Sequence, residues 1–479
     1  MSNLDNKGDQ AVDTGAALTS KFYSDAQSVK PLLDSVSPSF CLAKWQQVSL
    51  HLTTGHNNSC YHPPLHQVSL DDIKINPSAL HNTDHKKQQR IMMLRGERPK
   101  ECSYCWAIED AGNLSDRQYR SAEPWAIKDY DSIKKMRGHE DVIPSYVEVN
   151  FSNLCNLQCS YCSPQFSSSW GTEVAEHGAF PTNPPHNDPE YFKGSRRPIP
   201  IKEANPYVDA FWEWWPTLYP KLEHFRMTGG EPLMDKNTYK VFDYVLTNPK
   251  PNLHLNVTSN FSQEPRIFNK YLNYVKALCA GDNIEHFMQY VSLDCWGKQA
   301  EYSRHGLEFD LVWENVIRYM AEVPYKNSIT FIVTMHNLSL SNQAKLLEQI
   351  LELRKQFSQT YQRVWFDTPY LRQPYWQSLQ ILPREYSNSI NDSITFMQGN
   401  LETASNRFHG FKDYEIQRME RVRDWMLSPS GRDVMQDRAN FYRFFNAHDQ
   451  RRGTDFLKTF PEMTEFWNEC KNIKDHATS

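Results

Sequence analysis

From about residue 145 onward, short apolar runs alternate with stretches in which apolar positions recur every three or four residues. Helical patterns of this kind cover, for example, residues 237–246 and 340–357. Strands that alternate with helices are typical of a parallel sheet. We therefore predict an α/β fold over residues 145–370, either an open sheet or an incomplete barrel. The six predicted strands are 146–151, 224–227, 253–257, 288–293, 329–334 and 364–366.

The pattern differs on either side of this region. Residues 1–40 are polar and rich in Ser, Asp and Gly, which predicts a mobile leader. Residues 41–125 hold four cysteines and many histidines with little periodicity, which predicts a loop-rich module held by metal more than by an apolar core. Residues 171–207 are rich in Pro, His and Asn and are expected to form an inserted loop. Residues 371–479 are expected to be a mostly helical extension.

Composition and charge narrow the classes of function. The chain has 479 residues and a net charge of −5, enough for two or three domains and unlike a protein that coats nucleic acid. A basic run over residues 86–100 is interpreted as the charged face of a helix, so a nucleic acid partner is not expected. The apolar runs are too short to span a bilayer, and residues 1–10 lack the apolar segment of a secretion signal. We expect a cytoplasmic protein with no membrane contact.

Seven of the ten cysteines fall into two groups, and the first follows the predicted strand 146–151. Cys155, Cys159 and Cys162 have the spacing C-x3-C-x2-C. Three thiolates can hold three irons of a [4Fe–4S] cluster and leave the fourth iron open to another ligand. The alternative is a zinc site in which a histidine such as His62 supplies the missing ligand, although zinc sites more often use C-x2-C pairs.

A second motif follows the next predicted strand. It reads Met227-Thr228-Gly229-Gly230-Glu231-Pro232. Two glycines at a strand end let a ligand approach the backbone closely, and Glu231 can accept a hydrogen bond from an amine. An isolated Gly-Gly pair is more often an ordinary turn between a strand and a helix. Here its order and its distance from the cysteine loop favour a binding function.

Together these two motifs resemble the radical S-adenosylmethionine (SAM) superfamily, whose fold is a partial (β/α)6 barrel. The resemblance covers residues 145–370. It implies that the amino and carboxylate groups of SAM bind the open iron. Reduction of the cluster then cleaves SAM to a 5′-deoxyadenosyl radical, which abstracts a hydrogen atom from the substrate.

The resemblance also implies roles for individual residues at the carboxyl ends of the predicted strands, where barrel active sites are built. Tyr161 would lie against the adenine, and Asn260 would lie near SAM. Ser292 and Arg304 would hold the ribose and the carboxylate, since an arginine fork suits a carboxylate. Gly229, Gly230 and Glu231 would meet the methionine amine, and Pro232 of the same motif is also expected to bind the cofactor.

Cys295 follows the fourth predicted strand and is a candidate catalytic residue. A thiol at this face of a barrel could return a hydrogen atom to a substrate radical. The alternative interpretation is that a small cysteine packs beneath the loop.

The second cysteine group consists of Cys41, Cys60, Cys102 and Cys105. Four thiolates complete either a tetrahedral zinc site or a cubane cluster. The spacing C-x13-G-x4-C followed by C-x2-C resembles the first half of the SPASM/twitch auxiliary-cluster module, and the surrounding sequence is similar to twitch-domain radical SAM proteins, which are often phage-encoded. This resemblance implies an auxiliary [4Fe–4S] cluster. In most such enzymes the module follows the barrel, whereas here it precedes it.

These observations predict an oxygen-sensitive enzyme with two [4Fe–4S] clusters that uses SAM. The resemblance implies a peptide or protein side chain as substrate, with a small molecule as an alternative, and an electron donor such as flavodoxin or ferredoxin. A phage-encoded protein would work in the host cytoplasm. One rival is an RNA-modifying enzyme of the methylthiotransferase type, but the chain lacks a clearly basic C-terminal domain. The other is a non-enzymatic zinc-binding protein, which does not explain Gly229–Pro232.

Overall fold

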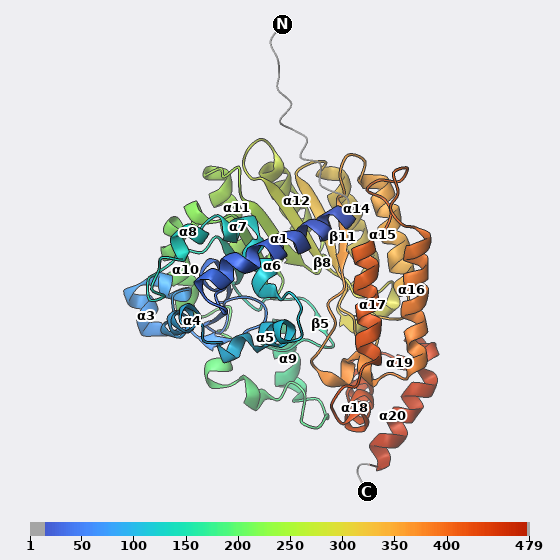
Figure 1. The fold of residues 1–479 in the computed structure, drawn as a ribbon. Helices are drawn as coiled ribbons and strands as arrows, with labels where there is room; N and C mark the ends of the chain where they lie inside the picture. The colour runs from blue at the N-terminus through green and yellow to red at the C-terminus, as the bar shows by residue number, and fades with distance from the viewer. Residues whose placement is uncertain (1–14, 477–479) are drawn as a thin grey trace. The chain divides into compact units, whose positions relative to one another are not determined.

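The computed structural model describes residues 15–476 (Figure 1). It divides into two compact units. The N-terminal unit comprises Phe22–Tyr290 and Arg304–Asn327. The C-terminal unit comprises Val291–Ser303 and Ser328 onward, together with the first described residues of the chain. No helix in the described part of the chain is long and apolar enough to cross a bilayer.

A mostly parallel sheet forms the centre of the N-terminal unit. Its strand order is β8-β7-β6-β4-β1-β2-β3, and β1, β4, β6 and β7 pair in parallel whereas β2 and β3 are antiparallel. Four of the predicted strands are confirmed here, each within two residues of the observed start and end. The strands are β1 (Gln47–His51), β2 (His56–Asn58), β3 (His66–Gln67), β4 (Tyr146–Asn150), β6 (His224–Thr228), β7 (His254–Ser259) and β8 (His286–Ser292).

Side chains on strands β1, β4, β6 and β7 alternate between an apolar and a polar face. The paired apolar rows are Val48, Val147, Phe225 and Leu255, followed by Leu50, Val149, Met227 and Val257. The intervening positions carry polar groups. Glu148 and Arg226 form an ion pair of 3.4 Å across β4 and β6, and the guanidinium lies 4.2 Å from the ring centre of Tyr290. The period of two therefore gives the sheet one face that packs under helices and one polar face.

Amphipathic helices connect the parallel strands. They are α10 (Pro206–Leu218), α11 (Lys236–Thr247), α12 (Pro265–Cys279) and α14 (Phe309–Glu322). Helix α11 begins where the side chain of Asp235 accepts a hydrogen bond from the amide of Asn237, and it buries Val241, Phe242 and Val245. Helix α12 packs against both α11 and α14. The predicted loop 171–207 begins inside α9 (Ser168–His177) and continues with the single-turn helices η3 (Pro189–Phe192) and η4 (Gly194–Arg196).

The cysteine-rich module differs from the loop-rich structure that the sequence predicts. It contains a buried apolar core around Trp45, Trp106 and Trp125. Most of its helices span only one or two turns, too few for a periodic apolar pattern to stand out. The helices are α2 (Ala43–Gln46), α3 (Leu70–Ile75), α4 (Asp84–Leu94), α5 (Ser103–Asp110), α6 (Asp116–Ala122), α7 (Pro124–Ile127) and α8 (Tyr130–Ile133), with η1 (Pro77–Leu80) and η2 (Lys100–Cys102) between them.

The predicted mobile leader also contains regular structure. Residues 1–14 lie outside the described chain, but helix α1 covers Gly15–Val36. Its residues Val29 and Leu33 are buried in the core of the cysteine-rich module. Ala26, Val29 and Leu33 recur at helical spacing, a signal that the polar composition around them obscures.

Strand β1 links this module to the sheet. Gln47–His51 pairs in parallel with Tyr146–Asn150 along its whole length. The sequence analysis did not predict this strand. Because of it, the module extends the sheet through main-chain hydrogen bonds and is not a separate domain beside it.

The C-terminal unit contains the last two predicted strands and the predicted helical extension. Strand β10 (Asn327–Ile332) pairs in parallel with β11 (Val364–Asp367). Helix α16 packs against α15 and α17, and α18 packs against α20. The helices are α13 (Lys298–Ser303), α15 (Gln343–Phe357), α16 (Ser387–Gly399), α17 (Asp413–Leu427), α18 (Val434–Arg452), α19 (Phe456–Thr459) and α20 (Thr464–His476), with the single turns η7 (Tyr375–Gln377), η8 (Leu379–Ile381), η9 (Arg384–Tyr386) and η10 (Pro461–Met463).

Candidate functional site

The three-cysteine loop follows β4 and brings its thiols together. Burial and the neighbouring Cys159 raise the pKa of the Cys162 thiol to about 12. Burial, followed by the repulsion of Cys159, raises the pKa of Cys155 well above its ordinary value. The three sulfurs therefore lie within electrostatic range of one another. A metal that binds here must displace their protons.

The first turn of α9 supports the shape of this loop. The indole of Trp170 donates a hydrogen bond of 2.9 Å to the carbonyl oxygen of Cys159, and the hydroxyl of Ser169 donates one of 2.7 Å to that of Cys155. Within the loop, the amide of Leu157 donates to the sulfur of Cys155 at 3.4 Å. These contacts fix the main chain, so the thiols are positioned before any ligand arrives.

The glycine turn after β6 packs directly against the cysteine loop. Gly229 and Gly230 have φ angles of 75° and 47°, a backbone region that favours glycine. A Cβ atom on Gly229 would lie 2.0 Å from the side-chain nitrogen of Asn150, and one on Gly230 would lie 2.6 Å from the carbonyl oxygen of Leu154. Glycine is thus required at both positions by backbone conformation and by space.

Glu231 holds the ends of β6 and β7 together. One carboxylate oxygen accepts hydrogen bonds from the amide of Leu233 at 3.1 Å and the hydroxyl of Ser259 at 2.8 Å, and the other accepts from the amide of Asn260 at 2.8 Å. Burial raises the pKa of Glu231 to about 7, although these hydrogen bonds oppose the shift. Pro232 is buried and begins the single-turn helix η6 (Pro232–Met234) that follows. The carboxylate is therefore occupied by donors of the protein itself.

Asn260 joins the end of β7 to the cysteine loop. Its side-chain nitrogen donates a hydrogen bond of 2.9 Å to the side-chain oxygen of Asn156. Asn156 in turn donates one of 2.8 Å to the carbonyl oxygen of Ser262. The sequence analysis missed Asn156 and Ser259, because single polar residues in a loop or at a strand end carry no distinctive spacing.

Arg304 lies beside the cysteine loop. Strand β5 (Gln158–Cys159) pairs with β9 (Arg304–His305), which places the arginine opposite Cys159. One terminal nitrogen of its guanidinium is 3.7 Å from the sulfur of Cys159, and the other donates a hydrogen bond of 2.5 Å to the hydroxyl of Tyr161. The side chain is largely buried. A fixed positive charge therefore borders the three thiols.

The N-terminal unit thus gathers most of the residues that the sequence analysis selected for the first site. Ser292 and Cys295 belong to the C-terminal unit. Ser292 ends β8, and Cys295 is fully buried. Next to it, the carboxylate of Asp294 accepts a hydrogen bond of 3.0 Å from the amide of Thr334. The functions assigned to Ser292 and Cys295 remain predictions.

The second cysteine group surrounds a small cavity in the N-terminal module. Burial raises the pKa of Cys60 to about 11 and that of Cys102 and Cys105 to about 12, and the charge of Cys41 adds to each shift. The four thiols converge on this cavity. The residues that line it are Cys41, Ala43, Lys44, Ser59, Cys60, Met93, Cys102, Cys105, Trp106, Asp116, Arg117 and Arg120.

The wall of this cavity combines three cationic side chains with the carboxylate of Asp116. The buried ammonium of Lys44 forms an ion pair with Glu101, and Arg117 and Arg120 contribute two further charges. Among residues 15–476, no three His, Cys, Asp or Glu side chains are arranged to hold a single metal ion. A cluster ligated by four thiolates carries net negative charge, so a cavity with cationic walls suits it.

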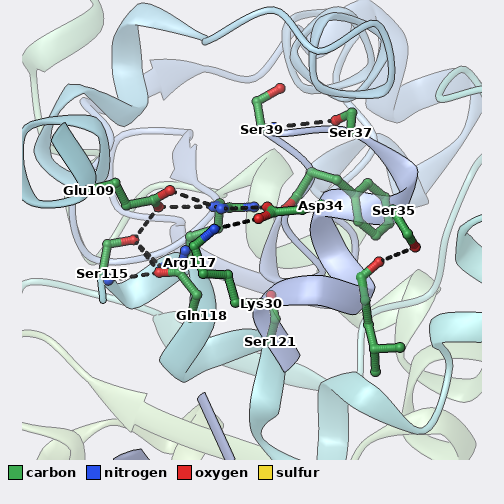
Figure 2. A network of polar contacts seen from close by, with 12 residues as sticks. Lys30, Asp34, Ser35, Ser37, Ser39, Glu109, Ser115, Arg117, Gln118 and Ser121 are labelled. Atoms are coloured by element: carbon green, nitrogen blue, oxygen red, sulfur yellow. Dashed lines mark hydrogen bonds and ion pairs between the residues drawn. The ribbon is translucent and has the colours of Figure 1, made fainter. Parts of the chain in front are cut away.

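Arg117 also anchors helix α1 to this wall (Figure 2). Its guanidinium donates two hydrogen bonds of 2.9 Å to Glu109, one of 3.1 Å to Asp34 of α1 and one of 3.0 Å to the carbonyl oxygen of Phe40. Ser115, two residues earlier, caps the start of α6. The buried arginine thus connects three segments around the four cysteines.

His62 does not supply a fourth ligand to the three-cysteine loop. Its ring nitrogen is 2.6 Å from the carboxylate of Asp116, and the ring stacks on Tyr104 with centres 3.7 Å apart. Asp116 lines the four-cysteine cavity. His62 therefore belongs to the surroundings of the second group.

The sequence matches no known family model and no curated protein. Among solved structures, the chain is similar to native anSMEcpe with bound AdoMet (13% identity, TM-score 0.34, 56% of this chain and 64% of that one). It is also similar to Streptococcus suis SuiB bound to the precursor peptide SuiA (12% identity, TM-score 0.33, 64% of this chain and 62% of that one). The chain spans less than two thirds of either structure's length, and likenesses this low decide neither fold nor function.

Proposed function

We propose that this chain is a radical SAM enzyme with a partial (β/α)6 barrel over residues 145–370. Cys155, Cys159 and Cys162 would hold a [4Fe–4S] cluster with one iron open to SAM. When bound and reduced, that cluster supplies an electron that cleaves SAM to a 5′-deoxyadenosyl radical, which abstracts a hydrogen atom from the substrate. The observation that carries this proposal is the convergence of the three thiols, the glycine turn and Arg304 at one end of the parallel strands.

The surrounding residues have distinct functions in this proposal. Gly229 and Gly230 let the turn pack closely against the cysteine loop, beside which the methionine amine of SAM would bind. Glu231 keeps that turn in place, because its carboxylate is used by the protein's own donors. Arg304 would bind the carboxylate of SAM through its planar fork. Tyr161, already hydrogen-bonded to Arg304, would lie against the adenine.

We further propose that the four-cysteine cavity holds an auxiliary [4Fe–4S] cluster of the twitch type, with structural zinc as the alternative. The cationic side chains of Lys44, Arg117 and Arg120 support the cluster, because they line the cavity that its negative charge would occupy. Four protein ligands leave no iron open to substrate. The auxiliary cluster would therefore serve electron transfer or structure.

The proposed substrate is a peptide or protein side chain, with flavodoxin or ferredoxin as the electron donor in the cytoplasm. The motif resemblance supports this choice of substrate. An RNA-modifying enzyme is less consistent with the charge of the chain, since acidic residues outnumber basic ones by 57 to 52. A phage origin, implied by the same resemblance, would place the reaction in the host cytoplasm.

The test is reductive SAM cleavage by protein that has been purified and reconstituted without oxygen. With dithionite as the reductant, the wild type is expected to form 5′-deoxyadenosine. Replacing Cys155, Cys159 and Cys162 together by Ala should abolish it. Cys279→Ala is the matched control, since Cys279 is buried in the same unit but belongs to neither cysteine group. Undiminished 5′-deoxyadenosine formation by the triple variant would overturn the proposal.

A further inference from the structure

The C-terminal unit contains a cavity of about 450 Å³, within the usual range for ligand sites. It lies where η7 and η8 meet the end of α17 and the start of α18. The function proposed above uses none of its residues. The residues that line it are Arg372, Gln373, Tyr375, Ser378, Gln380, Ile381, Trp425, Ser430, Arg432, Val434 and Asp437.

Hydrogen bonds hold the walls of this cavity in place. The side-chain nitrogen of Gln380 donates to the carbonyl oxygens of Trp425 at 3.1 Å and Ser428 at 3.3 Å, which ties η8 to the end of α17. Arg438 of α18 donates a hydrogen bond of 2.7 Å to the carbonyl oxygen of Ile381. Because hydrogen bonds join η8, α17 and α18, the cavity exists before any ligand binds. This lowers the entropy cost of binding.

Arg432 is fixed in one orientation at the edge of the cavity. Its guanidinium lies 3.3 Å from the ring centre of Tyr375. Its Nε and Nη2 atoms donate to the carboxylate of Asp437 at 3.2 and 3.4 Å. Asp437 is buried, whereas the Arg432 side chain is 41% exposed. The ring and the carboxylate thus orient the fork, and its other edge, which carries Nη1, is not used by Asp437.

The remaining walls combine a second cation with apolar surface. The guanidinium of Arg372 lies 5.4 Å from the ring centre of Tyr370. The indole of Trp425 stacks on the same ring with centres 4.3 Å apart. Ile381 and Val434 add aliphatic surface. The lining thus combines the oriented fork of Arg432 with apolar surface, which suits an anion that has an apolar neighbour.

We propose that this cavity binds a short acidic segment of a peptide, with a carboxylate side chain at Arg432 and an apolar side chain against Trp425. The proposal rests on the proposed function, because it gives the peptide or protein substrate a recognition segment. It also assigns a role to the C-terminal extension.

The test measures peptide binding to the full-length wild-type protein by isothermal titration calorimetry. The probe is Ac-Leu-Glu-Leu-Glu-NH2, compared with the analogues in which Gln or Lys replaces Glu. We expect the acidic peptide to bind about tenfold more tightly than the Gln peptide, and the Lys peptide to bind weakest. Equal affinity for the acidic and Lys peptides, or no binding of the acidic peptide at about 1 mM, would overturn the proposal.

Variants locate the binding. Arg432→Gln and Trp425→Ala should each weaken the binding of the acidic peptide about tenfold. Arg421→Gln removes an exposed arginine of α17 outside the cavity and should change nothing. If Arg432→Gln unfolds the protein because Asp437 loses its partner, Arg372→Gln provides a second test. If Arg432→Gln and Arg372→Gln both bind as the control does, the site is not this cavity.

Two further outcomes separate this proposal from its alternatives. If inorganic phosphate displaces the acidic peptide at equal concentration, the cavity binds a free anion, which contradicts the peptide assignment. Binding requires neither cluster nor SAM, so peptide affinity and 5′-deoxyadenosine formation are independent readouts. If the protein binds the peptide but does not cleave SAM, the proposed enzyme activity is refuted and the peptide site is retained. If it cleaves SAM but does not bind the peptide, only the peptide site is refuted.

Discussion

Arg304 donates a hydrogen bond of 2.5 Å to the hydroxyl of Tyr161, a residue 143 positions earlier in the chain. The pairing of β9 with β5 brings the two residues together. Tyr161 lies between Cys159 and Cys162, so the arginine is positioned by the same loop that carries the thiols. A positive charge is thus fixed at the edge of the proposed cluster site.

Arg304→Met should raise the KM for SAM by tenfold or more, because the carboxylate of SAM would lose a charged and oriented partner. Arg304→Lys should raise the KM for SAM less, since lysine keeps the positive charge but lacks the planar fork of the guanidinium. Both variants should retain the iron content of the wild type. The measurement is 5′-deoxyadenosine formation as a function of SAM concentration. An unchanged KM in the Met variant would show that Arg304 does not contact SAM.

Gly230→Ala should reduce iron at the three-cysteine loop, because its Cβ atom would lie 2.6 Å from the carbonyl oxygen of Leu154. Gly281→Ala is the matched control. Gly281 also has a positive φ of 57°, but a Cβ atom added to it would meet no other atom within 4 Å. The backbone strain of placing alanine at a positive φ, about 1 kcal/mol, is therefore common to both variants. Equal iron contents would show that the close contact does not shape the loop.

Iron counting tests the second cysteine group. The reconstituted wild type should contain about eight irons, four for each [4Fe–4S] cluster. Cys102→Ala should lower that number by about four and leave reductive SAM cleavage measurable. About four irons with one zinc in the wild type would favour the structural zinc site instead.

Glu231 makes the stability of the protein depend on pH. Burial raises its pKa from 4.5 to about 7 in the folded protein. Between these values the unfolded chain has released the proton that the folded chain keeps, so folded stability falls as pH rises from about 4.5 to about 7 and then levels off. Glu231→Gln removes this dependence, which amounts to roughly 3 kcal/mol at most. The measurement is the unfolding midpoint of the wild type and of the variant at each pH across that range. If the two midpoints change with pH in parallel, Glu231 does not cause the dependence.

Cys295→Ala separates two interpretations of a buried thiol. Both expect the variant to bind its clusters and cleave SAM. If Cys295 returns a hydrogen atom to the substrate radical, product formation should collapse while 5′-deoxyadenosine is still made. Normal turnover of substrate would make Cys295 a packing residue, consistent with its complete burial.

The sequence predicted the strands around the first site because short segments rich in apolar residues alternate there with helical stretches. It missed β1, because Gln47–His51 contains only two apolar residues and is recognisable as a strand only beside β4. The cysteine spacings located both groups of thiols. The contacts of Asn156 and Glu231 depend on segments brought together by the fold, so no local pattern indicates them.

The basic run at residues 86–100 is a second case in which contacts between distant segments could not be predicted from the sequence. It was interpreted as a charged helix face, yet Lys86 and Arg90 of α4 are fully buried. Lys86 donates hydrogen bonds to the carbonyl oxygen of Gln47 at 2.8 Å and to His81 at 2.9 Å. Their acceptors lie on other segments, so the sequence alone shows the charges but not their partners.

The parallel pairing of β1 with β4 has a consequence for how the protein is made. Gln47 leaves the ribosome roughly 100 residues before its partner Tyr146, so the module cannot complete its edge until that strand has been synthesised. Until then, β1 exposes an unpaired row of amides and carbonyls. Conversely, a chain truncated to begin after β1 would expose the same row on β4 and be prone to aggregate. The edge of the four-cysteine module is therefore completed only when β4 joins the sheet.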